Sequence, residues 1–514
     1  MLRIIKFLAS ALLTAFLAVG VFAQELPRPD GPRVLALTVG FNTAKATRWP
    51  DLSPETKAEV EGLERAYAAA NAARQFDEAM KIVHHAQVVV LGAKYTPLRA
   101  FASDLEMRAD HALLEPFQKV GLQIGEWYAL DETPTDKLTV QVILTKAPAG
   151  GFGGGGGAAA AEPVGEPLKT FALNPADLAE PMAISVLIPD VADGNYNLSV
   201  VCKPVEAGGE SFPIRASQQI RMQRGLTARM MALRTRLQKT KDPDPSADYR
   251  SALYDLVYAG EVPPGRIDFD VEFKEANALL DAGDKKTDPW VARHGDLHKA
   301  YRSGVDNTLQ PYRVYIPNGY DGTKSYPLII ALHGMGGDEN SYFDQYQQGL
   351  FKTLAEKHGY LVACPKGRQS ASMYQGSAEK DVMDVMAEMK RVYKVDATRV
   401  YLTGHSMGGY GTWSLAMAHP EVFAALAPIS GGGSAAGMAR IKNIPEIVIH
   451  GDADKTVNVD RSREMVEAGK KAGAEIKYIE VKGGSHVSVA APAFSDIFDF
   501  FDAHPGKPAA NGGN

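Results

Sequence analysis

From about residue 305 to 506, short apolar runs alternate with amphipathic stretches. Six apolar runs predict buried strands, namely Leu328–Leu332, Tyr360–Cys364, Val400–Thr403, Phe423–Ile429, Glu446–Ile449 and Ile476–Val481. Helical periodicity fills most of the intervals, at Tyr342–Lys357, Ala378–Tyr393, Met407–Ala418 and Ser462–Ala472. Strands that are apolar on both faces and alternate with helices predict a mostly parallel, doubly wound α/β sheet over residues 305–506. Such sheets bind ligands at the C-terminal ends of their strands.

The earlier part of the chain has different patterns. Alanine- and leucine-rich periodicity begins at Pro54 and continues to about residue 120, which predicts a helical hairpin or small bundle within residues 24–120. Apolar and polar positions then alternate between residues 121 and 222, as in Lys137–Leu144 and Tyr196–Val201, which predicts a small β-sandwich. Residues 223–304 return to helical periodicity and are predicted to link or brace the two ends.

Three segments have compositions that do not suit a packed core. The N-terminus places Arg3 and Lys6 before an apolar stretch that ends Val21-Phe22-Ala23, which predicts a signal peptide over residues 1–23 rather than a membrane anchor. The Gly/Ala tract 149–161 is predicted to be a mobile loop within the β-sandwich, and residues 507–514 a disordered tail. We therefore expect a secreted or periplasmic protein.

Composition narrows the classes of partner. The 514 residues carry a net charge of −6, and removal of residues 1–23, which contain two bases and no acid, would make it −8. This charge argues against nucleic acid as a partner, and no later segment is apolar enough for stable membrane insertion. The two cysteines, Cys202 and Cys364, are predicted to be buried strand residues, and their spacing suits no metal site. We expect no metal and no cofactor; the oligomeric state is not predicted.

The motif Gly404-His405-Ser406-Met407-Gly408 lies between a predicted strand and a predicted helix. A serine on such a sharp turn exposes its hydroxyl, and glycine is needed two residues to either side because a side chain there would collide with the turn. We interpret Ser406 as a nucleophile. The alternative is a glycine-rich turn that only packs.

A serine nucleophile needs a base and an acid, which in this type of sheet follow it in the order acid, then histidine. His486 follows the last predicted strand in a short loop and is the predicted base. The competing histidines are predicted to be structural, namely His84, His85, His405, His419 and His450. Asp454 is the predicted acid because it lies further beyond the strand end than Asp452, which remains the alternative and would otherwise cap the loop.

The oxyanion formed during acyl transfer needs two fixed N–H donors. The amide of Met407, directly after the nucleophile, is predicted to be one. The other is predicted to be the amide of Met335 in the loop 333–337, which follows the strand Leu328–Leu332. His333 is expected to brace that loop. Tyr410, Trp413 and Met417 form a helical stripe that is expected to belong to the core.

The segments His333–Gly337, Gly404–Trp413 and His450–Val457 resemble the α/β-hydrolase superfamily. They are most similar to its secreted esterase and predicted-peptidase branch, near the polyhydroxybutyrate depolymerase and feruloyl esterase-like enzymes. The resemblance covers residues 305–505 and implies a serine hydrolase with Ser406, Asp454 and His486 as its triad. Some relatives carry an immunoglobulin-like domain ahead of the hydrolase, which is compatible with residues 121–222. Relatives often have Gly before the catalytic histidine and Trp shortly after it, whereas Ser485 and Val487 flank His486.

These observations predict an exported serine esterase that works through an acyl-enzyme on an ester substrate. A carbohydrate-linked ester is one candidate. The other enzyme that fits the same residues is a serine peptidase of prolyl-oligopeptidase type. A hypothesis of another class is a non-catalytic binding protein on a hydrolase fold, which the loss of a triad member would favour. No triad member is lost in this sequence.

Overall fold

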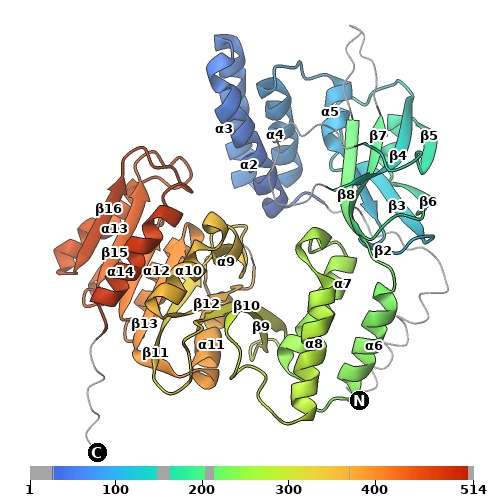
Figure 1. The fold of residues 1–514 in the computed structure, drawn as a ribbon. Coiled ribbons are helices and arrows are strands. Elements are labelled where there is room, and N and C mark those ends of the chain that lie inside the picture. Colours follow the sequence, from blue (N-terminus) through green and yellow to red (C-terminus); the bar gives the residue numbers. More distant parts are fainter. Residues whose placement is uncertain (1–25, 27, 148–161, 203–213, 370, 507–514) are drawn as a thin grey trace, which may run out of the picture. The chain divides into compact units, whose positions relative to one another are not determined.

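The computed structural model describes residues 26, 28–147, 162–202, 214–369 and 371–506 (Figure 1). The chain forms two compact units. Unit 1 is Met1–Met231 with Leu253–Glu272, and unit 2 is Ala232–Ala252 with Phe273–Asn514. The predicted signal peptide, the Gly/Ala tract 149–161 and the tail 507–514 lie outside the described residues. None of the helices in the described part of the chain is both long and apolar enough to span a bilayer.

Unit 2 is built on an eight-stranded sheet with the order β16-β15-β14-β13-β11-β12-β10-β9. Its strands are β9 (Gly295–Arg302), β10 (Leu309–Ile316), β11 (Tyr326–Leu332), β12 (Leu361–Pro365), β13 (Val395–His405), β14 (Ala425–Ile429), β15 (Glu446–Gly451) and β16 (Ile476–Val481). From β12 to β16 every neighbouring pair is parallel, whereas β9 and β10 form an antiparallel edge. The predicted mostly parallel α/β-hydrolase sheet is therefore confirmed.

Both faces of this sheet are covered because successive side chains of a strand point to opposite sides. In β11, Leu328 and Ile330 belong to one core cluster, and Ile329 belongs to the other. The first cluster receives α11 (Ser377–Val392) and α12 (Met407–Ala418), and the second receives α10 (Leu350–His358) and α14 (Phe494–Ala503). The remaining helices of this α/β region are α9 (Ser341–Asp344) and α13 (Asp460–Ala472). Fully buried strands explain the continuous apolar runs in the sequence.

The sheet begins earlier than predicted, at Gly295 rather than near residue 305, so the last ten residues of the predicted linker 223–304 belong largely to β9. The hydrophobic pattern did not predict β9, because this strand carries polar side chains that reach the interior only through contacts with specific partners. Asp296 accepts two 2.7 Å hydrogen bonds from Arg313 on β10. The ammonium of Lys299 lies 4.6 Å from the centre of the Trp290 ring. The predicted helix Tyr342–Lys357 is also interrupted, at Gly349, where φ is 87°.

Unit 1 combines helices with two small sheets. Its helices are α2 (Gly31–Arg48), α3 (Pro54–Ala72), α4 (Phe76–Val90) and α5 (Pro97–Asp104). Its strands are β1 (Leu105–Ala109), β2 (Leu113–Leu114), β3 (Lys119–Glu126), β4 (Leu138–Lys146), β5 (Lys169–Leu173), β6 (Met182–Leu187), β7 (Gly194–Cys202) and β8 (Ile214–Met222). They form the sheets β1-β3-β6 and β2-β8-β7-β4-β5, whose inner faces share one core cluster. An immunoglobulin-like domain remains a prediction for this region.

The predicted helical region 24–120 is wrong after Asp104, where the chain turns into β1. Burial alternates residue by residue along β1, which is the strand period, but five residues are too few to override the preceding helical pattern. Between the predicted sandwich and β9 lie α6 (Leu226–Lys239), α7 (Pro245–Tyr258) and α8 (Phe269–Asp284), and the boundary between the two units runs through them. Cys202 and Cys364 are buried strand residues, as predicted, and both are free cysteines.

The stability of unit 1 is expected to depend on the Asp104 carboxyl, which is fully buried. Its Oδ1 accepts hydrogen bonds from the amides of Trp127 and Tyr128, and burial, assisted by the charge of Glu126, raises its pKa to about 8. In the unfolded chain the carboxyl ionises near its ordinary pKa of 3.8. The folded state therefore holds the extra proton between these values, and the stability from this group is lost as the pH rises from about 4 to about 8.

The variant Asp104→Asn tests this expectation. An amide keeps the acceptor oxygen and cannot ionise, so unit 1 of the variant should lose less stability than the wild type as the pH is raised from 4 to 8. Each pH unit in that window is worth at most about 1.4 kcal/mol for one group. Thermal unfolding at several pH values measures the difference. An equal pH dependence in both proteins would show that Asp104 is already ionised in the folded state.

Candidate active site

Ser406 lies on a strained turn between β13 and α12. Its φ is 58° and its ψ is −117°, a conformation that a non-glycine residue rarely adopts. The turn is tightly packed on both sides. A Cβ atom on Gly404 would lie 2.2 Å from the Gly408 carbonyl oxygen, and one on Gly408 would lie 2.0 Å from the Leu332 carbonyl oxygen. Only glycine fits at these two positions, and the hydroxyl of Ser406 is presented at the C-terminal edge of the sheet.

The structure brings Ser406, His486 and Asp454 together from three loops. The Oγ of Ser406 lies 2.8 Å from Nε2 of His486, and Nδ1 of His486 lies 2.7 Å from Oδ2 of Asp454. The Asp454 side chain is fully buried, and that of His486 is 13% exposed. The arrangement places an acceptor nitrogen against the serine hydroxyl and a carboxylate against the opposite ring nitrogen, as nucleophilic catalysis by serine requires.

Asp454 is held as an ionised acceptor. Burial by itself would raise the pKa of this carboxyl, but hydrogen bonds from His486 and from the amides of Val457 and Thr456 outweigh burial and keep the pKa below its usual range. The Nε2 of His450 lies 3.1 Å from the Oδ2 that also contacts His486. An ionised, immobilised carboxylate can orient the His486 ring and stabilise its protonated form.

Asp452, the alternative acid, occupies a different position. Its Oδ1 accepts a 2.6 Å hydrogen bond from the amide of Gly483, three residues before His486. The side chain is exposed, and among the described residues it makes no hydrogen bond to the His486 ring. Asp452 therefore ties the loop after β16 to the loop after β15, which is the loop-capping role considered for it above.

The loop 333–337 lies beside Ser406, since a Cβ atom on Gly334 would be 3.4 Å from the Cβ of Ser406. His333 braces this loop, with Nδ1 2.8 Å from the Gly334 carbonyl oxygen and Nε2 2.8 Å from that of Lys366. Within the described part of the chain, the amides of Met335 and Met407 donate no hydrogen bond. Neither N–H group is therefore paired within the described residues, and their role as the oxyanion hole remains a prediction.

A second pair of residues, which sequence reasoning did not find, supports the loop of His486. The Nε2 of His405 lies 2.8 Å from the His486 carbonyl oxygen, and its Nδ1 lies 2.8 Å from the Tyr346 hydroxyl. Burial lowers the pKa of His405 to about 4, so the ring is neutral near pH 7. A neutral ring can donate from Nε2 to the carbonyl and accept at Nδ1 from the tyrosine. His405 was expected to be structural, and its contact partners come from other loops.

The other histidines have structural partners. His450 is buried and contacts Ser462 through Nδ1, at 2.7 Å. The Nε2 of His419 lies 2.9 Å from a Glu379 carboxylate oxygen. In unit 1, Nδ1 of His84 lies 2.8 Å from the Tyr128 hydroxyl, and the His85 ring stacks on Tyr95. Each of these contacts agrees with the structural role expected from the sequence.

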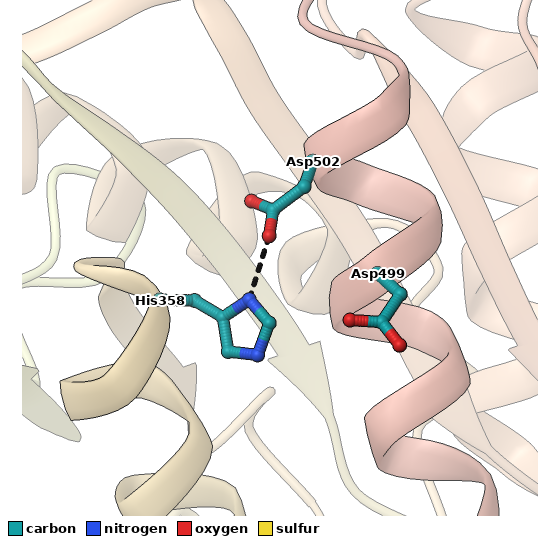
Figure 2. A group of neighbouring side chains, drawn as sticks. All are labelled: His358, Asp499 and Asp502. Atoms are coloured by element: carbon teal, nitrogen blue, oxygen red, sulfur yellow. Dashed lines mark hydrogen bonds and ion pairs between the residues drawn. The ribbon is translucent and has the colours of Figure 1, made fainter.

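A group of possible metal ligands lies on α10 and α14, apart from the triad residues (Figure 2). It consists of His358, Asp499 and Asp502, and Figure 2 shows the ring of His358 directed at Asp502, with Nδ1 2.6 Å from the Asp502 Oδ2. Both aspartates are exposed, and Asp502 also accepts a hydrogen bond from Tyr360. The contact with Asp502 accounts for Nδ1 of His358, whereas Nε2 of the same ring is buried and has no hydrogen-bond partner among the described residues.

Comparison with known protein families and proteins gives matches to the α/β part of the chain. Residues 307–440 match the family of putative esterases, a range that contains Ser406, Met335 and Met407 but ends before Asp454 and His486. The bifunctional acetylxylan esterase/xylanase of Neocallimastix patriciarum is 28% identical over 225 residues, which is 37% of this chain and 32% of that protein. The probable feruloyl esterase C of Aspergillus terreus is 29% identical over 196 residues, 37% of this chain and 68% of that protein.

The match thus spans about a third of the first relative and about two thirds of the second. The structural alignment with a solved thermostable esterase covers 78% of this chain and 99% of that esterase chain. The two sequences are 17% identical, and the TM-score is 0.37. That similarity is too low to carry an argument, so the fold assignment depends on the strand order described above.

Proposed function

The α/β sheet of this chain belongs to the esterase branch of the α/β-hydrolase superfamily, and from that premise we propose that the protein is an exported serine carboxylesterase with Ser406, His486 and Asp454 as its catalytic triad. The observation that carries the proposal is the continuous hydrogen-bonded path from the Ser406 hydroxyl through His486 to Asp454, at 2.8 Å and 2.7 Å. A binding protein would not need this path, and its completeness favours an enzyme.

Acylation follows from the geometry. Ser406 Oγ attacks the ester carbonyl carbon while Nε2 of His486 takes the hydroxyl proton, and Asp454 stabilises the resulting imidazolium. The carbonyl oxygen becomes an oxyanion that accepts hydrogen bonds from the amides of Met335 and Met407. When the tetrahedral intermediate collapses, the carbon–oxygen bond to the alcohol breaks and His486 gives its proton to the departing alkoxide. The products of this half-reaction are the alcohol and an acyl ester of Ser406.

Deacylation repeats these steps with water. His486 takes a proton from a water molecule as the water oxygen attacks the acyl carbon, and the same amides stabilise the second oxyanion. Collapse breaks the bond to Ser406 Oγ, which recovers its proton from His486. The acid is released and the enzyme returns to its starting state. No group outside the protein, the ester and water takes part in this scheme.

Ester substrates are favoured over peptides because the named relatives are esterases that act on acetylxylan or feruloyl groups. We propose by extension that the natural substrate is an ester linked to carbohydrate. A hydrolysis screen of nitrophenyl esters, acetylated and feruloylated sugars and peptide amides tests the proposal. Turnover of the esters with no cleavage of the amides is expected. Cleavage of amides alone would replace the proposal with a serine peptidase, and binding without turnover would indicate a non-catalytic protein.

We also propose that unit 1 supplies no catalytic group. All triad residues and both oxyanion donors belong to unit 2. A shortened chain that begins at Leu226 keeps all of unit 2 and should hydrolyse a small nitrophenyl ester within about tenfold of the full chain, because every group that contacts the ester carbonyl is retained. Ester turnover and the circular dichroism of the purified protein measure the outcome. A folded shortened chain without activity would show that unit 1 completes the site.

A chain that begins at residue 305 is the informative control. It lacks β9 and with it Asp296, which pairs with Arg313 and Lys352. The Arg313 side chain is only 8% exposed and would keep Asp344 as its one acidic partner, and removal of one partner from a buried ion pair costs up to about 3–5 kcal/mol. This shorter chain should fold poorly, whereas the chain from Leu226 should not.

A further inference from the structure

Two histidines meet at one oxygen of the Asp454 carboxylate. Nδ1 of His486 lies 2.7 Å from Oδ2, and Nε2 of His450 lies 3.1 Å from the same atom. The mechanism above uses only the first of these contacts. The side chains of His450 and Asp454 are both fully buried, so bulk water does not compete for the second contact. The His450 ring is therefore a fixed part of the surroundings of the proposed catalytic acid.

The proton of the His450 ring can be placed from its neighbours. Nε2 also lies 2.9 Å from the Val457 carbonyl oxygen, and since this oxygen and an ionised carboxylate can only accept, Nε2 carries the proton. Nδ1 lies 2.7 Å from the Ser462 hydroxyl, whose other contact, with the Gly431 carbonyl oxygen, is longer at 3.1 Å. Burial lowers the pKa of His450, which favours a neutral ring. The ring thus donates from Nε2 and accepts at Nδ1.

The same ring joins the two ends of the loop that carries Asp454. His450 is the next-to-last residue of β15, and Val457, whose carbonyl it contacts, lies three residues beyond Asp454. Oδ1 of Asp454 accepts from the amides of Thr456 and Val457 at 2.8 Å and 2.9 Å. With the two histidines at Oδ2, both oxygens of the carboxylate accept two hydrogen bonds, which fills its acceptor sites. A carboxylate held in this way keeps Oδ2 directed at His486.

We propose that His450 is a positioning residue for the catalytic acid, and this rests on the proposed function of Ser406. Its Nε2–H group holds Oδ2 of Asp454 toward His486 and neutralises part of the carboxylate charge. The first effect supports kcat, because a displaced carboxylate would let the His486 ring turn away from Ser406. The second effect limits how strongly Asp454 favours the protonated form of His486, so the base remains free at a lower pH.

Other charged or titratable groups lie around the two rings. The His405 ring lies 4.8 Å from the His486 ring, centre to centre, and burial lowers the pKa of His405 to about 4. Glu480 on β16 is the register partner of His450, and its hydrogen bonds with Arg463 lower its pKa to about 2. Both groups keep one protonation state near pH 7. A change in the pH dependence of activity there is expected to come from the two histidines on Asp454.

Two amide substitutions separate the two nitrogens of His450. The amide nitrogen of a glutamine reaches about as far as Nε2, whereas that of an asparagine reaches only about as far as Nδ1. His450→Gln can therefore still donate to Asp454, and His450→Asn keeps only the contact with Ser462. The control is His419→Asn, the same change at a histidine whose Nε2 lies 2.9 Å from the Glu379 carboxylate. The quantities measured with a nitrophenyl ester are kcat, KM and the acidic limb of the pH profile of kcat/KM.

His450→Asn should lower kcat about tenfold at pH 8 with little change in KM, and should move the acidic limb upward by about one pH unit. His450→Gln should restore the position of the limb and keep at least about a third of the wild-type kcat. His419→Asn should match the wild type. The proposal is overturned if the two His450 variants behave alike, or if His450→Asn loses activity without a shift of the limb, because loosened packing alone would have that effect.

The remaining outcomes are also decisive. Turnover by the wild type would still support the proposed function if His450 failed these tests, whereas no turnover of any ester by the wild type would overturn both proposals. Thermal unfolding shows whether the variants fold. If neither His450 variant folds, NMR of the wild type labelled with ¹⁵N at histidine decides, since a proton on Nε2 of His450 near pH 7 supports the proposal and a bare Nε2 overturns it.

Discussion

Ser406→Ala should remove ester hydrolysis and leave the fold intact. The hydroxyl is the only group lost, and alanine tolerates the φ of 58° about as well as serine does, so the turn between β13 and α12 keeps its geometry. Members of a triad act as a unit, and the loss of the nucleophile alone is expected to lower kcat by about 10⁴–10⁶. Steady-state kinetics with a nitrophenyl ester and thermal unfolding of both proteins measure the two parts of this prediction.

A second serine on the same helix serves as the matched control. The Oγ of Ser414 donates to the Gly411 carbonyl oxygen within α12, so Ser414→Ala should retain nearly full activity. A fluorophosphonate probe should label the wild type and the Ser414→Ala variant at Ser406 and should not label Ser406→Ala. The assignment of the nucleophile would fail if Ser406→Ala kept more than about a tenth of the wild-type kcat.

Asp454→Asn should lower kcat by about 10³–10⁴. In the wild type, Oδ1 of Asp454 accepts from the amides of Thr456 and Val457, and Oδ2 faces Nδ1 of His486. An asparagine would keep its oxygen toward these two amides and turn its NH₂ toward His486. Nδ1 would then have to accept a hydrogen bond, the ring proton would move to Nε2, and Nε2 could no longer take the proton of Ser406.

Asp452→Asn is the control for this change. It removes the same charge two residues earlier, but asparagine can still accept the hydrogen bond from the Gly483 amide. A loss of less than about tenfold is therefore expected, through a small displacement of the His486 loop. The pH dependence of kcat for both variants separates a wrong tautomer from a loosened loop. A larger loss in Asp452→Asn than in Asp454→Asn would reassign the acid.

The elements that could be predicted are those whose burial repeats regularly along the chain. The strands from β11 to β15 are mostly buried runs, and α11, α12 and α13 begin and end within two residues of their predicted bounds. Where the burial of a polar side chain depends on one specific partner, the strand was not predicted. β9 is a strand that carries Asp296 and Lys299, and these side chains lie beside the sheet core only because Arg313 and Trp290 receive them. β1 was not predicted, because the helical pattern that precedes it was extended through its five residues.

The sequence by itself determined the turn that holds Ser406, the glycines that the turn requires, and the order in which the candidate acid and histidine follow. These features depend on steric limits that act within a few residues, so a short motif is enough to predict them. Only the tertiary structure showed that Asp454 rather than Asp452 contacts His486, and that His405 and Tyr346 hold the His486 loop. Each of these contacts joins loops from different strands. Their separations are set by the spacing and twist of the sheet, which no local pattern encodes.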